Sequence, residues 1–141
     1  KIEFNPGVEK FCQFLLSRGS KLAIASGGFV PFAQALQARI PFDYIRANEL
    51  EIDNGHLTGK VINTIINADE KAIALQNWAK ELDLSLEQCM AVGDGANDLK
   101  MLATAVSGVA YHAKPMVNEQ ATSVLKYGEM GVLTELYKSF C

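Results

Sequence analysis

Cysteine, proline and tryptophan are scarce in this sequence of 141 residues, which contains three cysteines, four prolines and one tryptophan. The cysteines lie far apart, at positions 12, 89 and 141, and none forms a Cys-x-x-Cys pair. An odd number of widely spaced cysteines is most simply interpreted as free thiols in a reducing compartment. This pattern favours a cytoplasmic protein.

An excess of basic charge and long apolar runs are also lacking. The 13 Lys and Arg residues against 16 Asp and Glu residues give a net charge of −3. We therefore expect no nucleic-acid partner. The apolar runs are far too short to span a bilayer and no signal-peptide pattern opens the chain, so we expect no membrane association. No repeat, low-complexity stretch or linker divides the sequence, which predicts a single domain over residues 1–141.

Short apolar runs alternate with amphipathic stretches along the chain. This alternation predicts a doubly wound, mainly parallel α/β sheet. A favoured type I′ turn at Asn54-Gly55 adds a β-hairpin, with arms at 49–53 and 56–61. The other predicted strands are 21–25, 41–47, 89–92, 107–111 and 122–125; helices are predicted from Val8, Pro31, Ala68 and Leu99, as a turn at 118–121, and at 131–140.

The most polar strand-to-helix connection is Gly93-Asp94-Gly95-Ala96-Asn97-Asp98. It follows a predicted buried strand, and ligands bind at that edge of open α/β sheets. Two carboxylates and an amide are oxygen donors that suit Mg²⁺. The alternative is ordinary turn chemistry, in which Asn97 or Asp98 only caps the next helix. The spacing does not match an EF-hand calcium loop.

Two further polar features fall at a strand end and a helix start. Ser26-Gly27 precedes a helix, where backbone amides and the hydroxyl could hold a phosphate; the alternative is a capped helix after a glycine turn. Lys71 lies in the first turn of a long helix, where a cation opposes the helix dipole; the alternative is an exposed lysine. Phosphoryl transfer needs groups that bind phosphate, a positive charge and a carboxylate that binds magnesium. The sequence offers a candidate for each, which indicates phosphoryl chemistry.

The sequence resembles the haloacid-dehalogenase-like hydrolases and, within them, the phosphoserine phosphatases. The resemblance rests on five segments that follow the family's order: 25–29 (ASGGF), 47–50 (ANEL), 71–72 (KA), 93–99 (GDGANDL) and 110–115 (AYHAKP). It implies a Rossmann-type fold and magnesium-dependent hydrolysis of a phosphomonoester. The implied substrate is O-phospho-L-serine, converted to L-serine and phosphate in serine biosynthesis.

The resemblance also implies a role for each matching residue. Ser26 and the Gly27 amide would hold the transferring phosphoryl group. Lys71 would be catalytic, neutralising charge on the phosphate and the nucleophile. Three residues of the 93–98 connection also have implied roles. Asp94 would bind the metal, Asn97 would contact the phosphate or the substrate, and Asp98 would support the magnesium shell or orient Lys71.

One part of the family pattern is missing. The family's nucleophile and acid/base are two aspartates of an Asp-x-Asp motif on the first strand, but the aspartates here, at 43, 53, 69, 83, 94 and 98, form no such motif. The first residue is Lys1, not methionine. We therefore expect residues 1–141 to be the C-terminal portion of a catalytic domain, without its first strand and helical cap, and to be inactive alone.

The missing strand has a predicted place in the sheet. In the family it lies between the strands predicted at 21–25 and 89–92. Without it, backbone donors, acceptors and apolar surface would be exposed on both sides. We therefore expect no stable monomer from these residues alone, and a partner strand from a missing N-terminal segment or a dimer partner.

Three other functions compete with this one. A non-catalytic relative would bind phosphate or a partner without turnover. A phosphatase of another small phosphomonoester would share the same residues, because the cap that selects the substrate is absent. The phosphorylation domain of a cation-pumping ATPase also carries Gly-Asp-Gly-x-Asn-Asp, but the Ser-Gly-Gly-Phe segment and the lack of membrane spans argue against it.

Overall fold

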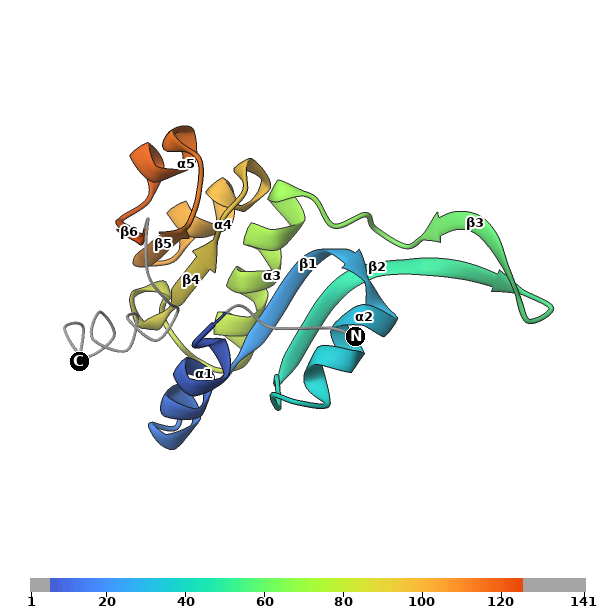
Figure 1. The fold of residues 1–141 in the computed structure, drawn as a ribbon, viewed down its shortest axis with the longest axis horizontal. Coiled ribbons are helices and arrows are strands. Elements are labelled where there is room, and N and C mark those ends of the chain that lie inside the picture. Colours follow the sequence, from blue (N-terminus) through green and yellow to red (C-terminus); the bar gives the residue numbers. More distant parts are fainter. Residues whose placement is uncertain (1–5, 126–141) are drawn as a thin grey trace.

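The computed structural model describes residues 6–125, which form two three-stranded sheets with helices packed against them (Figure 1). The strand orders are β1-β2-β3 and β4-β5-β6. The strands are β1 (Ala23–Phe29), β2 (Tyr44–Asp53), β3 (His56–Ile62), β4 (Met90–Gly93), β5 (Ser107–Tyr111) and β6 (Ser123–Leu125). The helices are α1 (Val8–Ser17), α2 (Val30–Gln37), α3 (Ala68–Glu81), α4 (Leu99–Thr104) and α5 (Pro115–Gln120), with 3₁₀ turns η1 (Leu86–Gln88) and η2 (Ala96–Asp98).

Within residues 6–125, all strand pairs are parallel except in one hairpin. β1 pairs with β2 in parallel, and β5 pairs in parallel with both β4 and β6. Among the described strands, only β2 and β3 are antiparallel. Asn54 and Gly55 join them with φ values of 50° and 79°, which are the positive angles that a type I′ turn requires. The predicted mainly parallel α/β fold with one added hairpin is confirmed.

β1 and β4 are each the end strand of their sheet (Figure 1). Within residues 6–125 no strand pairs with the outer side of either one. α3 connects the two sheets, because it contacts β1 and β2 of one and also η2 and α4 beside the other. The described part of the chain therefore carries two separate sheets held together by helices.

α1 forms a second connection between the sheets through adjacent side chains. Phe11 packs with Val109 of β5 in one buried cluster. Cys12 packs with Leu22 and Ile40, which flank β1 and α2, in another. A third cluster lies around α4 and β5 and contains Ala91, Leu102, Ala105, Ala110 and Val117. Burial of these small apolar clusters holds the two sheets in place.

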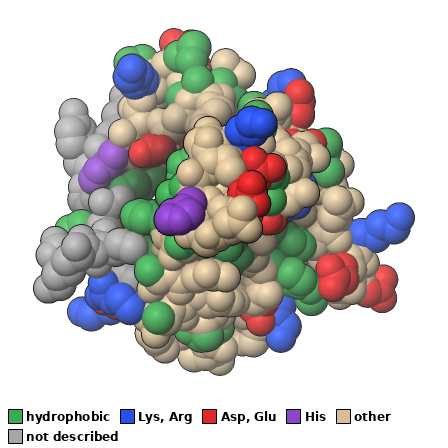
Figure 2. Space-filling view, turned by 90° about the vertical axis from the view of Figure 1, so that its right-hand side faces the viewer, with side chains coloured by type: hydrophobic (Ala, Val, Ile, Leu, Met, Phe, Trp, Pro, Cys, Tyr) green, Lys and Arg blue, Asp and Glu red, His purple; other side chains and the backbone are tan. Residues whose placement is uncertain are grey.

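The hairpin of β2 and β3 projects from the body of the molecule (Figure 1). Figure 2 looks onto this side and shows Lys and Arg side chains dispersed around the face, with no continuous basic patch among the described residues. No helix within residues 6–125 is long and apolar enough to cross a membrane.

Several element boundaries differ from those predicted. β1 continues to Phe29, so Ser26 lies in the strand and not in a loop after it. β2 is one strand, where the sequence predicted two, because its residues pair first with β1 and then with β3. α5 begins at Pro115 and is longer than the predicted turn, since proline suits the first helical position. The helix predicted at 131–140 lies outside the described residues.

Candidate active site

Ser26 lies in an irregular stretch of β1. Ala25 pairs with Arg46, and the next paired residue is Phe29, opposite Asn48. Three residues of β1 thus lie opposite a single residue of β2, and the strand bulges at Ser26-Gly27-Gly28. The Ser26 hydroxyl accepts a hydrogen bond of 2.9 Å from the Gly28 amide. The alternative of a capped helix after a glycine turn is wrong, because the two glycines lie within β1, the residue before α2 is Phe29 and no side chain caps that helix.

Lys71 lies in the first turn of α3 and is only 6% exposed. Its ammonium nitrogen, Nζ, lies 2.7 Å from Oδ1 of Asp98. The two acidic residues before it face other cations, since Asp69 pairs with Lys100 and Glu70 with Arg46. The alternative of an exposed lysine is therefore wrong, and the partner of Lys71 comes from the loop after β4.

Asp98 organises this loop with both of its carboxylate oxygens. Oδ1 accepts a hydrogen bond from the Lys71 ammonium. Oδ2 accepts hydrogen bonds from the backbone amides of Asp94 at 3.2 Å and Gly95 at 3.1 Å. The residue is 6% exposed. Although it stands before α4, its side chain makes no capping bond to that helix. Asp98 therefore does not cap α4, and its bond to the Gly95 amide caps the preceding 3₁₀ turn η2 instead.

The neighbouring glycine leaves room for this carboxylate. A Cβ atom on Gly93 would lie 2.5 Å from the Cβ and 2.6 Å from Oδ2 of Asp98. Carbon atoms in contact are normally about 3.5–4.0 Å apart. A side chain at position 93 would displace Asp98, and with it the contact to Lys71.

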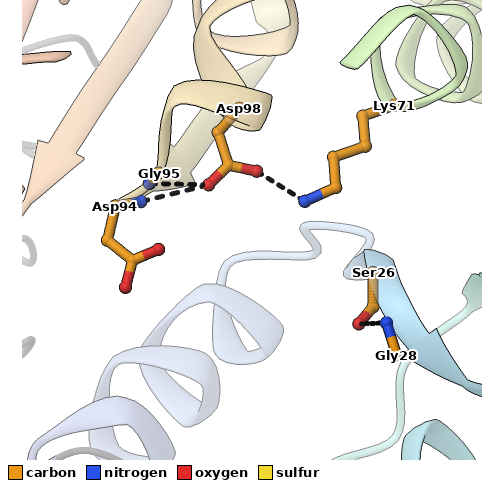
Figure 3. Close-up of polar contacts among 6 residues, drawn as sticks. All are labelled: Ser26, Gly28, Lys71, Asp94, Gly95 and Asp98. Carbon is orange, nitrogen blue, oxygen red and sulfur yellow. Dashed lines mark hydrogen bonds and ion pairs between the residues drawn. The ribbon is translucent and has the colours of Figure 1, made fainter. Parts of the chain in front are cut away.

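Asp94 has a carboxylate that no described residue engages. Its side chain is exposed, and its carboxylate makes no contact with Lys71 or Asp98 in Figure 3. No cluster of three His, Cys, Asp or Glu side chains that could enclose a metal occurs within residues 6–125. Mg²⁺ needs only one or two carboxylates and keeps several waters. Asp94 therefore fits as one ligand of a magnesium ion, whereas both oxygens of Asp98 are already occupied.

Figure 3 shows Ser26 in the bulge of β1 and Lys71 paired with Asp98 of the loop that follows β4. Ser26 and Gly27 come from β1, Lys71 from α3, and Asp94 and Asp98 from the loop after β4. Asn97 lies in η2 between the two aspartates and is exposed. The site thus combines a buried cation, an unengaged carboxylate and a hydroxyl on a glycine-rich bulge.

Sequence reasoning gave no role to Asn48, which the structure places beside this site. The side chain donates to the Gly27 carbonyl at 2.8 Å and accepts from the Ile66 amide at 2.8 Å. The residue is 8% exposed. One signal could have identified it, because asparagine is disfavoured in the middle of a strand and must satisfy its polar groups when buried.

Comparisons with known proteins identify the family of the chain. The family model of haloacid dehalogenase-like hydrolases matches residues 1–103. The chain therefore belongs to the haloacid dehalogenase-like hydrolase family.

Within that family, the similarity is to phosphoserine phosphatases. The phosphoserine phosphatase of Streptococcus thermophilus is 46% identical over 121 residues, covering 86% of this chain and 56% of that protein. A crystal structure of the probable phosphoserine phosphatase from Vibrio cholerae has a TM-score of 0.93 and 38% identity over 99% of this chain and 43% of that one. A substrate-bound phosphoserine phosphatase complex has a TM-score of 0.84 and 33% identity, over 96% of this chain and 63% of that one. This chain spans about half the length of such relatives.

Proposed function

We propose that these residues form the phosphate- and magnesium-binding part of a phosphomonoesterase that converts O-phospho-L-serine to L-serine and phosphate. The observation that carries the proposal is the buried Lys71 ammonium of α3, which pairs with Asp98 in the loop after β4. A buried cation beside an unengaged carboxylate suits a dianionic ligand together with a metal ion. The likeness to phosphoserine phosphatases supports the choice of substrate, a role in serine biosynthesis and a cytoplasmic location.

Lys71 is the proposed catalytic cation. Among the described residues, its ammonium donates one hydrogen bond, to Asp98. An ammonium has three donors, so two remain for phosphate oxygens. During phosphoryl transfer, negative charge is spread over the equatorial oxygens. A positive charge that is already held in place stabilises them without reorganisation.

Ser26 and Gly27 are the proposed phosphate holders. The Ser26 hydroxyl oxygen accepts a hydrogen bond from the Gly28 amide. The hydroxyl hydrogen therefore remains available to donate to a phosphate oxygen. The glycines at 27 and 28 carry no side chain that would keep a ligand away from the backbone. A further contact to the phosphate or the serine part of the substrate is assigned to Asn97, which is exposed in η2.

Asp94 is the proposed magnesium ligand, with Asp98 as the residue that holds its loop. Bound Mg²⁺ neutralises charge on the phosphate and orients it. Asp98 accepts the Asp94 amide, which fixes the backbone from which the Asp94 carboxylate extends.

The nucleophile in this proposal comes from a further strand between β1 and β4. The 141 residues contain no Asp-x-Asp motif, and both β1 and β4 are end strands within the described residues. An aspartate on such a strand would attack phosphorus while a second aspartate gives a proton to the departing serine oxygen. Residues 1–141 alone are therefore inactive in this proposal.

Phosphate release from O-phospho-L-serine by the full-length gene product tests the proposal. We expect release that requires Mg²⁺ and is lost in Asp94→Asn. The matched control is Asp69→Asn, since Asp69 is an exposed aspartate that pairs with Lys100 on the surface.

Two results would overturn the proposed reaction. Release from other small phosphomonoesters, without release from phosphoserine, would identify a different substrate. Phosphate binding without release from any phosphomonoester would identify a non-catalytic relative. Equal loss of activity in the Asp69 and Asp94 variants would remove the special role of Asp94.

A further inference from the structure

Asn48 joins the two segments that carry the proposed phosphate-binding groups. It lies on β2, which contributes no predicted site residue. Its side-chain nitrogen donates to the Gly27 carbonyl in the bulge of β1, and its side-chain oxygen accepts the Ile66 amide before α3. Both bonds are 2.8 Å long. One buried amide therefore uses a donor and an acceptor on two different parts of the site.

The bond to Gly27 controls the orientation of a peptide that holds Ser26. The Gly27 carbonyl and the Gly28 amide belong to one planar peptide group, and they point in opposite directions. When Asn48 holds the carbonyl, it also fixes the Gly28 N–H, which donates to the Ser26 hydroxyl. The bulge has lost regular pairing with β2 between Ala25 and Phe29, so this side chain replaces a bond of the strand ladder.

The bond to Ile66 holds the start of the helix that carries Lys71. Ile66 is buried and precedes Asn67, whose side chain caps α3 by accepting the Glu70 amide at 3.0 Å. Lys71 follows in the first turn and donates to Asp98. The position of this segment relative to β2 therefore affects where the Lys71 ammonium lies.

We infer that Asn48 is a positioning residue that sets the Ser26 hydroxyl and the Lys71 ammonium at the spacing a phosphoryl group requires. It touches neither the substrate nor the metal in this account. The inference rests on the proposed function and deepens it. Errors of about 1 Å in such positions are enough to reduce catalysis about 100-fold.

Substitution with aspartate separates the two bonds. Asn48→Asp keeps an oxygen to accept the Ile66 amide, but it loses the donor to Gly27 and places a carboxylate against that carbonyl. Asn48→Ala removes both bonds. Asn77→Asp is the matched control, because Asn77 is an exposed asparagine on α3.

The test is steady-state kinetics of the full-length gene product on O-phospho-L-serine with Mg²⁺, together with inhibition by inorganic phosphate. For Asn48→Asp we expect KM and the phosphate inhibition constant to rise about tenfold, as for the loss of one buried hydrogen bond, with a smaller change in kcat. Asn48→Ala should also lower kcat, because the segment before α3, the helix that carries Lys71, loses its bond to β2. Asn77→Asp should match the wild type.

A double-mutant cycle with Ser26→Ala distinguishes positioning from a general structural role. If Asn48 acts through the Ser26 segment, the effects of Asn48→Asp and Ser26→Ala on phosphate inhibition are not additive. Additive effects, unchanged constants in Asn48→Asp, or an Asn48→Asp protein that no longer melts cooperatively would each overturn the inference. A wild-type protein that releases no phosphate would instead overturn the proposed function, and the inference with it.

Discussion

Lys71 Nζ and Asp98 Oδ1 lie 2.7 Å apart, and the two side chains are 7% and 9% exposed. Removing two charges from water is costly, and their attraction offsets that cost only when the remaining polar groups are satisfied. Asp98 meets this condition, because its second oxygen accepts two backbone amides. The Lys71 ammonium is therefore held in place by a carboxylate whose two oxygens are both hydrogen-bonded.

Breaking this pair should destabilise the protein strongly. Asp98→Asn leaves the buried Lys71 charge unpaired, and we expect the free energy of unfolding to fall by about 3–5 kcal/mol. Asp69→Asn is the control, since its pair with Lys100 is exposed and should contribute about 0–1 kcal/mol. Urea unfolding of the full-length gene product measures both. Equal losses for the two variants would contradict the importance of burial.

Gly93 and Gly27 should respond differently to alanine. A Cβ at Gly93 would lie 2.5 Å from Asp98, whereas at Gly27 the nearest atom would be the Ile66 carbonyl oxygen at 3.9 Å. We expect Gly93→Ala to lower the free energy of unfolding by about 1–3 kcal/mol, the usual cost of overpacking. Gly27→Ala should cost less than about 1 kcal/mol. Thermal melts of both variants check the difference, and a Gly93 variant as stable as wild type would show that Asp98 moves freely.

The sequence predicted which segments carry the site residues better than it predicted the contacts between those residues. The alternation of apolar runs and turn residues placed Lys71 at a helix start and Asp94 after a strand, but it placed Ser26 after a strand that in fact continues to Phe29. It could not show that Asp98 holds its own loop, since this depends on distances between a side chain and amides three and four residues before it. The role of Asn48 also depends on a tertiary contact, with Ile66 eighteen positions away.

Strand ends were harder to predict than strand existence. The glycines at 27 and 28 are typical of a loop, yet pairing of Phe29 with Asn48 keeps the segment within β1. Likewise, β2 continues through the polar Asn48 because its neighbours β1 and β3 supply pairing partners along its length. Tertiary pairing thus overrides local propensity at both positions.

Residues 1–141 should not form a stable monomer by themselves. β1 and β4 each present a free side among the described residues, and unpaired strand sides favour association with other chains. We expect size-exclusion chromatography of this 15.4 kDa polypeptide to give aggregates or oligomers, and its thermal transition to be broad. The full-length gene product is the control. A monodisperse monomer of the short polypeptide with a cooperative melt would contradict this prediction.

The two thiols in the described residues should react slowly in the folded protein. Burial raises the pKa of the Cys12 thiol, and Glu9 adds to the shift; burial also raises the pKa of the Cys89 thiol. The thiolate is the reactive form, so iodoacetamide at neutral pH should modify both residues more slowly than a free peptide thiol. Cys12 should be the slower one, because it is buried whereas Cys89 is half-buried.

The same shifts fix the direction of a pH effect on stability. Because folding raises both pKa values, the folded state favours the protonated thiols. Their contribution to the free energy of unfolding is complete at neutral pH and is lost as the pH rises through the raised pKa values.

Mass spectrometry of peptides after alkylation measures the rate at which each cysteine is modified. Unfolding in urea should make the modification rates of the two cysteines equal. Rapid alkylation of Cys12 in the folded protein would show that α1 does not keep it buried between Leu22 and Ile40.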